Sequence, residues 1–239
     1  MGRPGKRPEG LQPPILYADE DLVVIDKPAG LLVHPARGGE AQTVVGLLGG
    51  LLGGGEPGRE GVVHRLDRDT SGLLVLARNQ AAYAALREAI RRREVSREYI
   101  ALAGGRLAHR EGTVEAPIGR DPHAPTRRGV GGRGVREART TFRVLALLPD
   151  TTLLGVRLHT GRTHQIRVHL AALGHPLVGD PLYGGAQLPG LNRQFLHAAR
   201  LAFRHPRDGR ALLFTSPLPA DLAAALAKAQ AAPVTIRRR

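Results

Sequence analysis

Cysteine and tryptophan are absent from this 239-residue chain, and aromatic residues make up only 3% of it. Without cysteine the chain can form no disulfide bond, thiolate nucleophile or zinc–thiolate site. The longest uncharged apolar stretch, residues 43–55, is too short and too rich in glycine to span a bilayer. No apolar signal segment follows the basic N-terminus. These absences predict a soluble, cytoplasmic protein whose core is held together by packing alone.

Acidic residues are scarce relative to basic ones. Lys and Arg total 35 against 21 Asp and Glu, which gives a formal net charge of +14. A surplus of this size attracts polyanions, and arginine grips phosphate with a planar fork and stacks on bases. The charge therefore favours RNA or DNA over a small acidic substrate. Charge alone does not decide this, because a GC-rich genome also enriches arginine.

The chain is organised as one domain between two basic ends. Residues 1–13 contain three prolines and three glycines, which predict a flexible basic arm. Residues 14–232 form the predicted folded domain, and residues 233–239 form a basic tail. No internal repeat is visible.

Apolar periodicity and turn residues predict many short strands and few helices. Strands are expected over residues 15–17, 21–26, 31–33, 73–77, 96–102, 139–147, 153–159, 195–203 and 211–215. Helices are expected over residues 43–52, 80–93, 163–173 and 220–231, and a mobile basic loop over residues 126–137. Asn79 and Thr163 are the expected caps of the second and third helices. Hairpin-like links between most strands favour an α+β fold around a mainly antiparallel sheet.

Residues 64–78 are the most informative stretch, and they read His-Arg-Leu-Asp-Arg-Asp-Thr-Ser-Gly-Leu-Leu-Val-Leu-Ala-Arg. Asp67 stands between Arg65 and Arg68 at a turn that leads into an apolar strand. Nearby positive charges favour the ionised carboxylate, which suits a nucleophile or a base. For a lone aspartate between arginines, a solvated turn with local ion pairs would be the commoner interpretation.

The same stretch closely resembles the catalytic motif of the RluA family of RNA pseudouridine synthases, in which the aspartate after His-Arg-Leu is essential. The resemblance assigns the catalytic role to Asp67 and places His64 and Leu66 in the substrate site. It also implies that Arg65 fills the space vacated by a flipped-out base.

Further matches to this family follow in the expected order from Ile15 to Thr215. They imply the pseudouridine synthase fold, a long mixed sheet flanked by helices and loops, with the active site in its cleft. Too few residues precede Ile15 for the N-terminal RNA-binding domain of many relatives. We therefore expect residues 14–232 to be the catalytic domain alone.

Residues 158–170 form a second motif, Leu-His-Thr-Gly-Arg-Thr-His-Gln-Ile-Arg-Val-His-Leu. A strand here is expected to run into a glycine turn and a helix N-terminus, a geometry that favours an anion. The stretch resembles the family's Leu-x-Thr-Gly-Arg-x-His-Gln-Ile-Arg motif, whose first arginine lies beside the catalytic aspartate. The resemblance implies that Arg162 is the ion-pair partner of Asp67.

Three other segments complete the expected site. Residues 97–102, Arg-Glu-Tyr-Ile-Ala-Leu, resemble the family's Lys/Arg-x-Tyr-x-Ala-Leu motif, whose tyrosine lines the active site. Tyr99 is therefore the third catalytic candidate and the best candidate for stacking on an extruded base. Leu196 is expected to form an apolar wall behind that base, and Asp180 and Tyr183 are expected to stabilise a turn and not to react.

The implied reaction isomerises specific uridines to pseudouridine and needs no cofactor. The expected partner is a stem–loop of ribosomal or transfer RNA, bound by a monomer, with no membrane partner. Basic residues of the second helix and of the mobile loop are the candidates for phosphate contacts. They are Arg91, Arg92, Arg127, Arg128 and Arg133.

Histidines 159, 164, 169 and 175 raise the question of a metal. His164 and His169 are five positions apart, about 500° of helical rotation, and lack the glutamate of a His-Glu-x-x-His site. We therefore expect no metal. Two alternatives remain, a catalytically silent RNA-binding protein of the same fold and a metal-dependent nuclease. Intact Asp67, Tyr99 and Arg162 argue against the first, and the histidine spacing argues against the second.

Overall fold

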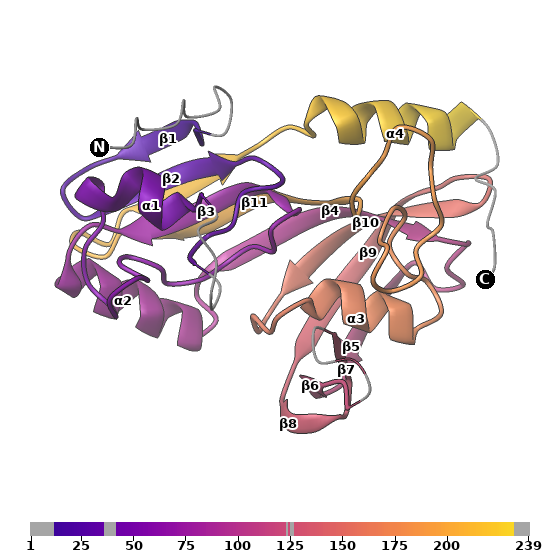
Figure 1. The fold of residues 1–239 in the computed structure, drawn as a ribbon, viewed down its shortest axis with the longest axis horizontal. Coiled ribbons are helices and arrows are strands. Elements are labelled where there is room, and N and C mark those ends of the chain that lie inside the picture. The colour runs from indigo at the N-terminus through magenta and orange to yellow at the C-terminus, as the bar shows by residue number, and fades with distance from the viewer. Residues whose placement is uncertain (1–11, 36–41, 123, 125–126, 232–239) are drawn as a thin grey trace, which may run out of the picture.

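The computed structural model describes residues 12–35, 42–122, 124 and 127–231. Within this part of the chain there is a nine-stranded sheet and a separate three-stranded sheet (Figure 1). The large sheet contains β1 (Ile15–Ala18), β2 (Leu22–Lys27), β3 (Ser71–Ala77), β4 (Ser96–Gly104), β5 (Glu111–Glu115), β9 (Arg139–Leu147), β10 (Thr151–Leu158), β11 (Leu196–Arg204) and β12 (Ala211–Thr215). The small sheet contains β6 (Ile118–Arg120), β7 (Arg128–Val130) and β8 (Arg133–Arg136). The helices are α1 (Val44–Leu48), α2 (Gln80–Arg91), α3 (Gln165–Ala172) and α4 (Ala220–Ala231), with a short 3₁₀ turn at Gly49–Leu51.

The predicted α+β fold around a mainly antiparallel sheet is confirmed. The large sheet follows the order β1-β2-β3-β11-β4-β10-β9-β5, with β12 paired to β11. Its strand pairs are antiparallel except for the short parallel pair of β3 and β11, in which Gly72 lies opposite Ala198. Gly72 has a φ of +113°, and a Cβ there would lie 2.3 Å from the Ala198 carbonyl oxygen. Glycine at this position therefore allows the two sections of the sheet to join.

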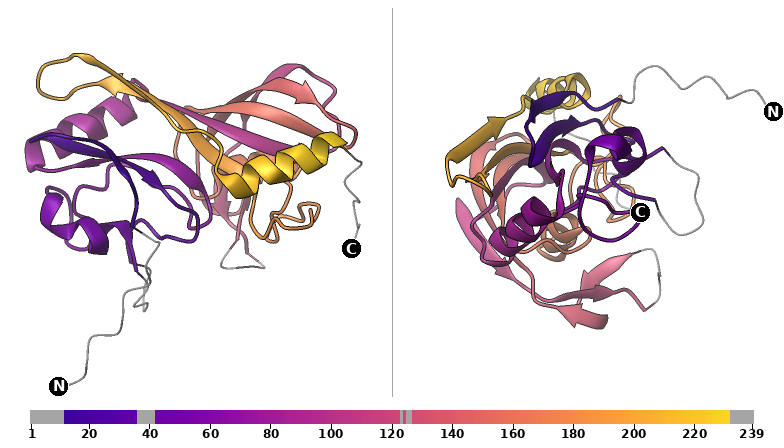
Figure 2. Two further views of the ribbon diagram at one scale, coloured as in Figure 1. Left: turned by 90° about the horizontal axis from the view of Figure 1, so that it is seen from above. Right: turned by 90° about the vertical axis from the view of Figure 1, so that its left-hand side faces the viewer.

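Alternation along β4 decides which helix covers which face of the sheet. Tyr99 packs in one apolar cluster with Ile166 of α3, whereas Leu102 packs in another with Leu222 of α4. Odd and even positions of a strand point to opposite faces. The two helices therefore lie on opposite sides of the sheet (Figures 1 and 2).

Local sequence signals place several elements where we expected them. Asn79 caps α2, since its Oδ1 accepts a hydrogen bond from the backbone nitrogen of Ala82 at 2.9 Å. The elements β12 and α4 occupy the predicted ranges. No helix in the described ranges is long and apolar enough to cross a membrane.

The basic segment at 126–137 differs from the prediction of a mobile loop. It contains β7 and β8, which both pair with β6. Gly131 and Gly132, with φ of +74° and +83°, turn the chain between the two strands. Thr126, residues 1–11 of the predicted basic arm and the predicted tail over residues 233–239 lie outside the described residues.

The predicted cap of α3 is also wrong. His164, not Thr163, occupies the N-cap position, in a left-handed conformation with φ of +58° and without a side-chain capping bond. The side chain of Gln165 stabilises this helix start instead, because its Oε1 accepts a hydrogen bond from the backbone nitrogen of Arg162 at 3.0 Å. The predicted strand at 31–33 is reduced to a single bridge between Leu32 and Thr43.

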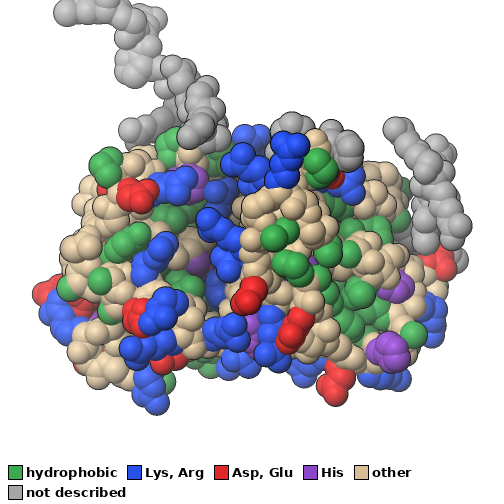
Figure 3. Space-filling model, turned by 90° about the horizontal axis from the view of Figure 1, so that it is seen from below, with side chains coloured by type: hydrophobic (Ala, Val, Ile, Leu, Met, Phe, Trp, Pro, Cys, Tyr) green, Lys and Arg blue, Asp and Glu red, His purple; other side chains and the backbone are tan. Residues whose placement is uncertain are grey.

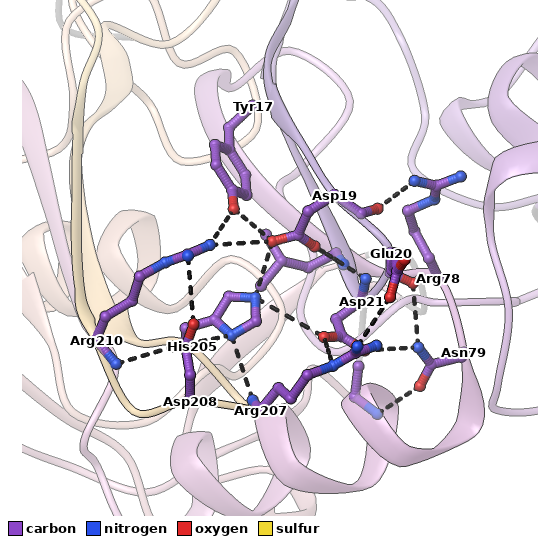
Figure 4. A network of polar contacts seen from close by, with 12 residues as sticks. Tyr17, Asp19, Glu20, Asp21, Arg78, Asn79, His205, Arg207, Asp208 and Arg210 are labelled. Carbon is purple, nitrogen blue, oxygen red and sulfur yellow. Dashed lines mark hydrogen bonds and ion pairs between the residues drawn. The ribbon is translucent and has the colours of Figure 1, made fainter.

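A network of charged side chains ties the β1–β2 turn to the β11–β12 hairpin (Figure 4). Buried His205 lies 2.8 Å from Asp19, and Arg207 contacts both carboxylate oxygens of Asp21 at 2.6 and 2.8 Å. Asp19, Asp21 and His205 are close enough to hold a metal ion. Arg207 and Arg210 already pair with the two carboxylates, so the network acts as a structural clamp.

We expect Asp21→Asn to lower the free energy of unfolding by about 1–2 kcal/mol at pH 7, because it removes the charge that Arg207 contacts. Glu20→Gln is the matched control: Glu20 also bonds Arg207, at 2.8 Å, but its side chain is 82% exposed, so little change is expected. Denaturant unfolding monitored by circular dichroism measures both values.

The same pair of variants gives a pH test. Hydrogen bonds from Arg207 and Asn79 hold the pKa of Asp21 below its usual range. The stabilisation is therefore present above the unfolded-state pKa of about 3.9 and is lost as the pH falls through the lower folded-state value. The penalty of Asp21→Asn should shrink in acid, and a penalty that grows as the pH falls would contradict this assignment.

Candidate active site

Asp67 lies on the turn that precedes β3, close to the junction of β3 and β11. Its side chain is 17% exposed, and the backbone oxygen of Asp67 accepts a hydrogen bond from the nitrogen of Thr70 at 3.2 Å. The preceding Leu66 is buried in the same apolar cluster as Tyr99. Burial of Leu66 and the closed turn together fix the direction in which Asp67 projects.

The ion-pair partner of Asp67 is Arg167, on α3. The Arg167 Nη1 lies 3.4 Å from the Asp67 carboxylate, while its Nε and Nη2 donate to Asp180 at 2.7 and 2.9 Å. Burial opposes the charge of Arg167, but hydrogen bonding and attraction to Asp180 outweigh it and raise the pKa of Arg167. Arg167 therefore remains a fixed cation between two carboxylates.

Our prediction that Arg162 would pair with Asp67 is wrong. The Nε of Arg162 donates to the backbone oxygen of Glu137 at 2.9 Å, in the connection between β8 and β9. Arg162 lies before α3, in the loop held by Gln165, whereas Arg167 lies within the helix. The helix, not the loop, therefore presents the cation to Asp67.

Asp180 braces its turn, as predicted. This fully buried carboxylate accepts hydrogen bonds from the backbone nitrogens of Leu182 and Tyr183 at 3.0 and 3.3 Å. The ring of Tyr183 lies 5.1 Å from the guanidinium carbon of Arg167. Asp180 thus has a further role that the sequence analysis missed, because it positions the arginine that contacts Asp67.

Tyr99 is buried beside Asp67. Burial raises the pKa of Tyr99 to about 12, and the negative charge of Asp67 acts in the same direction while Arg97 opposes it. Tyr99 is therefore a protonated phenol near neutral pH, able to stack or to donate a hydrogen bond.

A small recess of about 40 Å³ is lined by Leu66, Asp67, Tyr99, Arg162, Arg167 and Leu196, among others. A cavity of about 800 Å³ shares Arg65, Asp67, Tyr99 and Arg162 with it and also reaches His64. The structure thus brings together all seven residues predicted for catalysis and substrate binding. Basic side chains gather along a hollow in the middle of one face of the molecule (Figure 3).

The guanidinium of Arg65 contacts His34 at the edge of the site. The His34 Nδ1 lies 3.0 Å from the oxygen of Pro35, so this nitrogen is the donor and the Nε2 accepts from Arg65 at 2.9 Å. Burial lowers the pKa of His34, which favours this neutral form. No motif in the sequence points to His34 as a contact of the site.

Of the five arginines predicted to contact RNA, Arg91 lines the cavity of about 800 Å³. Arg128 and Arg133 lie in the small sheet with Arg127 just before it, whereas Arg91 and Arg92 share Glu88 at 2.5 and 2.7 Å. The four histidines considered as metal ligands are each hydrogen-bonded to protein groups. Among the described residues they form no metal-binding group.

Lys27 anchors the turn that carries Asp67. This fully buried side chain donates to the carbonyl oxygens of Pro28, Leu31 and Arg68 at 2.9, 2.8 and 2.8 Å. Three acceptors match the three hydrogens of an ammonium group. Burial lowers the pKa of Lys27 to about 7, while Asp69 and Asp67 act in the opposite direction.

We expect Lys27→Met to lower the free energy of unfolding by about 2–4 kcal/mol, because three carbonyl oxygens lose their donor. Lys228→Met is the matched control, since the Nζ of Lys228 donates to one carbonyl oxygen, that of Pro189, at an exposed site. Chemical denaturation compares the two. Equal, small losses would show that Lys27 does not anchor the turn.

Several known proteins are similar to this chain over most of its length. Residues 21–172 match the family model described as RNA pseudouridylate synthase. Ribosomal large subunit pseudouridine synthase D of Nitrosomonas europaea is 47% identical over 224 residues, which cover 89% of this chain and 64% of that protein. An uncharacterized RNA pseudouridine synthase of Chloroflexus aurantiacus is 51% identical, over 86% of this chain and 66% of that protein. The chain thus spans slightly less than two thirds of the length of these two relatives.

Solved structures show the same likeness. Human RNA Pseudouridylate Synthase Domain Containing 4 superposes with a TM-score of 0.70 at 26% identity, covering 90% of this chain and 92% of that one. Human RNA Pseudouridylate Synthase Domain Containing 1 gives a TM-score of 0.69 at 27% identity, covering 92% and 90%. This chain therefore shares its α+β architecture with each of the two human proteins over most of their length.

Proposed function

Because the chain belongs to the RNA pseudouridylate synthase family, we propose that it isomerises specific uridines of structured RNA to pseudouridine with Asp67 as the catalytic carboxylate. The observation that supports the proposal is the recess in which Asp67, Tyr99 and Arg167 meet, although they come from a turn, a strand and a helix far apart in sequence. A carboxylate that contacts a buried arginine and lies beside a buried tyrosine is stronger support for a catalytic site than a solvated surface ion pair would be.

The proposed reaction keeps every atom of the nucleoside except the exchanged hydrogens. The N1–C1′ bond breaks, the uracil turns, and C5 bonds to C1′; the hydrogen on C5 leaves to solvent and N1 takes up a proton. Asp67 would act by adding to C1′, by adding to C6, or by removing the C2′ proton. All three routes use the carboxylate that Arg167 contacts, and none requires a cofactor.

The other residues of the recess take the roles of a pocket for an extruded base. The base leaves its stack at a cost of a few kcal/mol, which pocket contacts offset. In this proposal the Tyr99 ring stacks on the uracil and Leu196 forms the apolar wall behind it. Arg65 releases His34 and enters the space that the base has vacated.

We favour RNA of the large ribosomal subunit as the substrate, because the Nitrosomonas europaea relative is named a ribosomal large subunit pseudouridine synthase. Arg127, Arg128, Arg133, Arg91 and Arg92 would supply phosphate contacts, while the shape of the RNA loop would supply selectivity. We propose that the protein acts as a monomer in the cytoplasm. Transfer RNA is the second candidate and enters as an arm of the test below.

RNA labelled with tritium at C5 of uridine should release label into water on incubation with this protein, with EDTA present and no cofactor added. Asp67→Asn keeps the side-chain shape but removes the anion, so we expect it to lower the rate by at least about 1,000-fold while RNA binding survives. Ribosomal and transfer RNA from cells that lack the gene provide the substrates.

Asp69→Asn is the matched control, because Asp69 lies two residues farther along the same turn and does not line either cavity described above. It should release label at nearly the parent rate. A silent RNA-binding protein would release no label from either RNA, and a metal-dependent nuclease would cut the chain only when EDTA is left out. Normal release by Asp67→Asn would remove Asp67 from the mechanism.

A further inference from the structure

Arg97 is a buried cation that the site described so far does not use. It projects from β4 on the same face as Tyr99, and it is only 5% exposed. Across the described ranges no carboxylate lies within ion-pair distance of Arg97, and its buried Nε has no hydrogen-bond partner. Burial without a partner disfavours the charge and lowers the pKa of Arg97. A buried N–H group without an acceptor costs free energy, which a ligand that accepts its hydrogen bond would offset.

His64 presents a second donor that has no acceptor in the part of the chain that the structure describes. The backbone nitrogen of Val75 donates to the His64 Nε2 at 3.3 Å, so that nitrogen carries no proton. Burial and the charge of Arg97 lower the pKa of His64 to about 3, which keeps the ring neutral. The single ring proton is therefore on Nδ1, and the buried Nδ1 has no partner among the described residues.

Both residues line the cavity of about 800 Å³ that also contains Asp67 and Tyr99. Gly161 leaves room for the guanidinium, because a Cβ at that position would lie 3.1 Å from the Arg97 Nη1. Arg97 therefore lines the same cavity that receives the substrate in our proposal.

The charge of the cavity decides which acceptor fits. Seven arginines and three acidic residues line it, and Glu88, one of the three, already pairs with Arg91 and Arg92. A neutral acceptor such as a uracil oxygen would leave this surplus uncompensated. A phosphate oxygen accepts several hydrogen bonds and carries the opposite charge, so it suits the fork of Arg97.

We propose that Arg97 and the Nδ1 of His64 bind a backbone phosphate adjoining the target uridine, inside the catalytic cavity. The inference rests on the proposed function for the identity of the ligand as RNA. Such a contact fixes the nucleotide by its phosphate while its base occupies the recess beside Asp67. It differs from the surface phosphate contacts above because Arg97 is already ordered and desolvated before RNA binds.

The test is a titration followed by ¹⁵N–¹H NMR of the arginine Nε–H groups, with uridine, uridine 3′-monophosphate and uridine 5′-monophosphate as probes. The Arg97 resonance is assigned by its loss in Arg97→Gln. We expect at least one of the two nucleotides, and not uridine, to shift this resonance. Arg97→Gln should weaken binding of that nucleotide about tenfold or more, and Arg97→Lys should weaken it less.

Arg204→Gln is the charge-matched control, since Arg204 is exposed on β11 and bonds its own hairpin at Gly209. It should leave nucleotide affinity unchanged. An equal shift with uridine, or parent-like affinity in Arg97→Gln, would overturn the proposal. If Arg97→Gln does not fold, the wild-type titration and Arg97→Lys still decide the matter.

This experiment is independent of turnover. Phosphate-dependent shifts at Arg97 in a protein that releases no tritium would refute the proposed isomerisation and leave the phosphate site standing. If the protein releases tritium but neither nucleotide shifts its Arg97 resonance, the phosphate site is refuted and the proposed isomerisation stands.

Discussion

The site depends on one buried cation, the guanidinium of Arg167 between Asp67 and Asp180. Removing an arginine from water is costly unless its charge and its N–H groups are satisfied. Asp180 offsets that cost through a bidentate ion pair with Arg167, and Asp180 itself accepts hydrogen bonds from two backbone nitrogens. The Nη1 of Arg167 reaches Asp67, so α3, the Asp180 turn and the Asp67 turn are fixed relative to one another.

Strands β2, β3 and β11 of the large sheet hold the turn that carries Asp67. Gly72 lets β3 approach β11, and Lys27 ties the backbone of the Asp67 turn to the end of β2. The chain is therefore anchored directly after Asp67, at Arg68 and at Gly72 in β3. A carboxylate on such a turn is preorganised, which is what the proposed reaction requires of a group that must meet C1′, C6 or the C2′ proton.

Signals that act within a few residues made much of the fold predictable. Asn79 marks the start of α2 because its capping bond spans three positions, and the alternation of Arg97, Tyr99 and Ala101 marks one face of β4. The small sheet was missed because its strands are short and rich in Arg and Gly, so no apolar period distinguishes them from a loop.

The partner of Asp67 could not be derived in the same way. Arg162 and Arg167 both occur in the matched motif, and which of them reaches Asp67 depends on how α3 packs against the sheet. The pairing of Arg167 with Asp180 is also a tertiary contact, set by the return of the chain after the helix. The donors of Arg97 and His64 that lack a partner among the described residues likewise cannot be recognised until burial and hydrogen bonding are known.

The most direct test of the account compares the single-turnover rate of pseudouridine formation in Arg167→Lys and Arg162→Lys, after circular dichroism has shown both to be folded. Lysine keeps the charge but cannot bridge two carboxylates with a planar fork. If Arg167 holds Asp67 in place, Arg167→Lys slows the reaction by about 100-fold or more, while Arg162→Lys slows it by less than about 10-fold. The opposite order would contradict the assignment of Arg167 as the residue that holds Asp67.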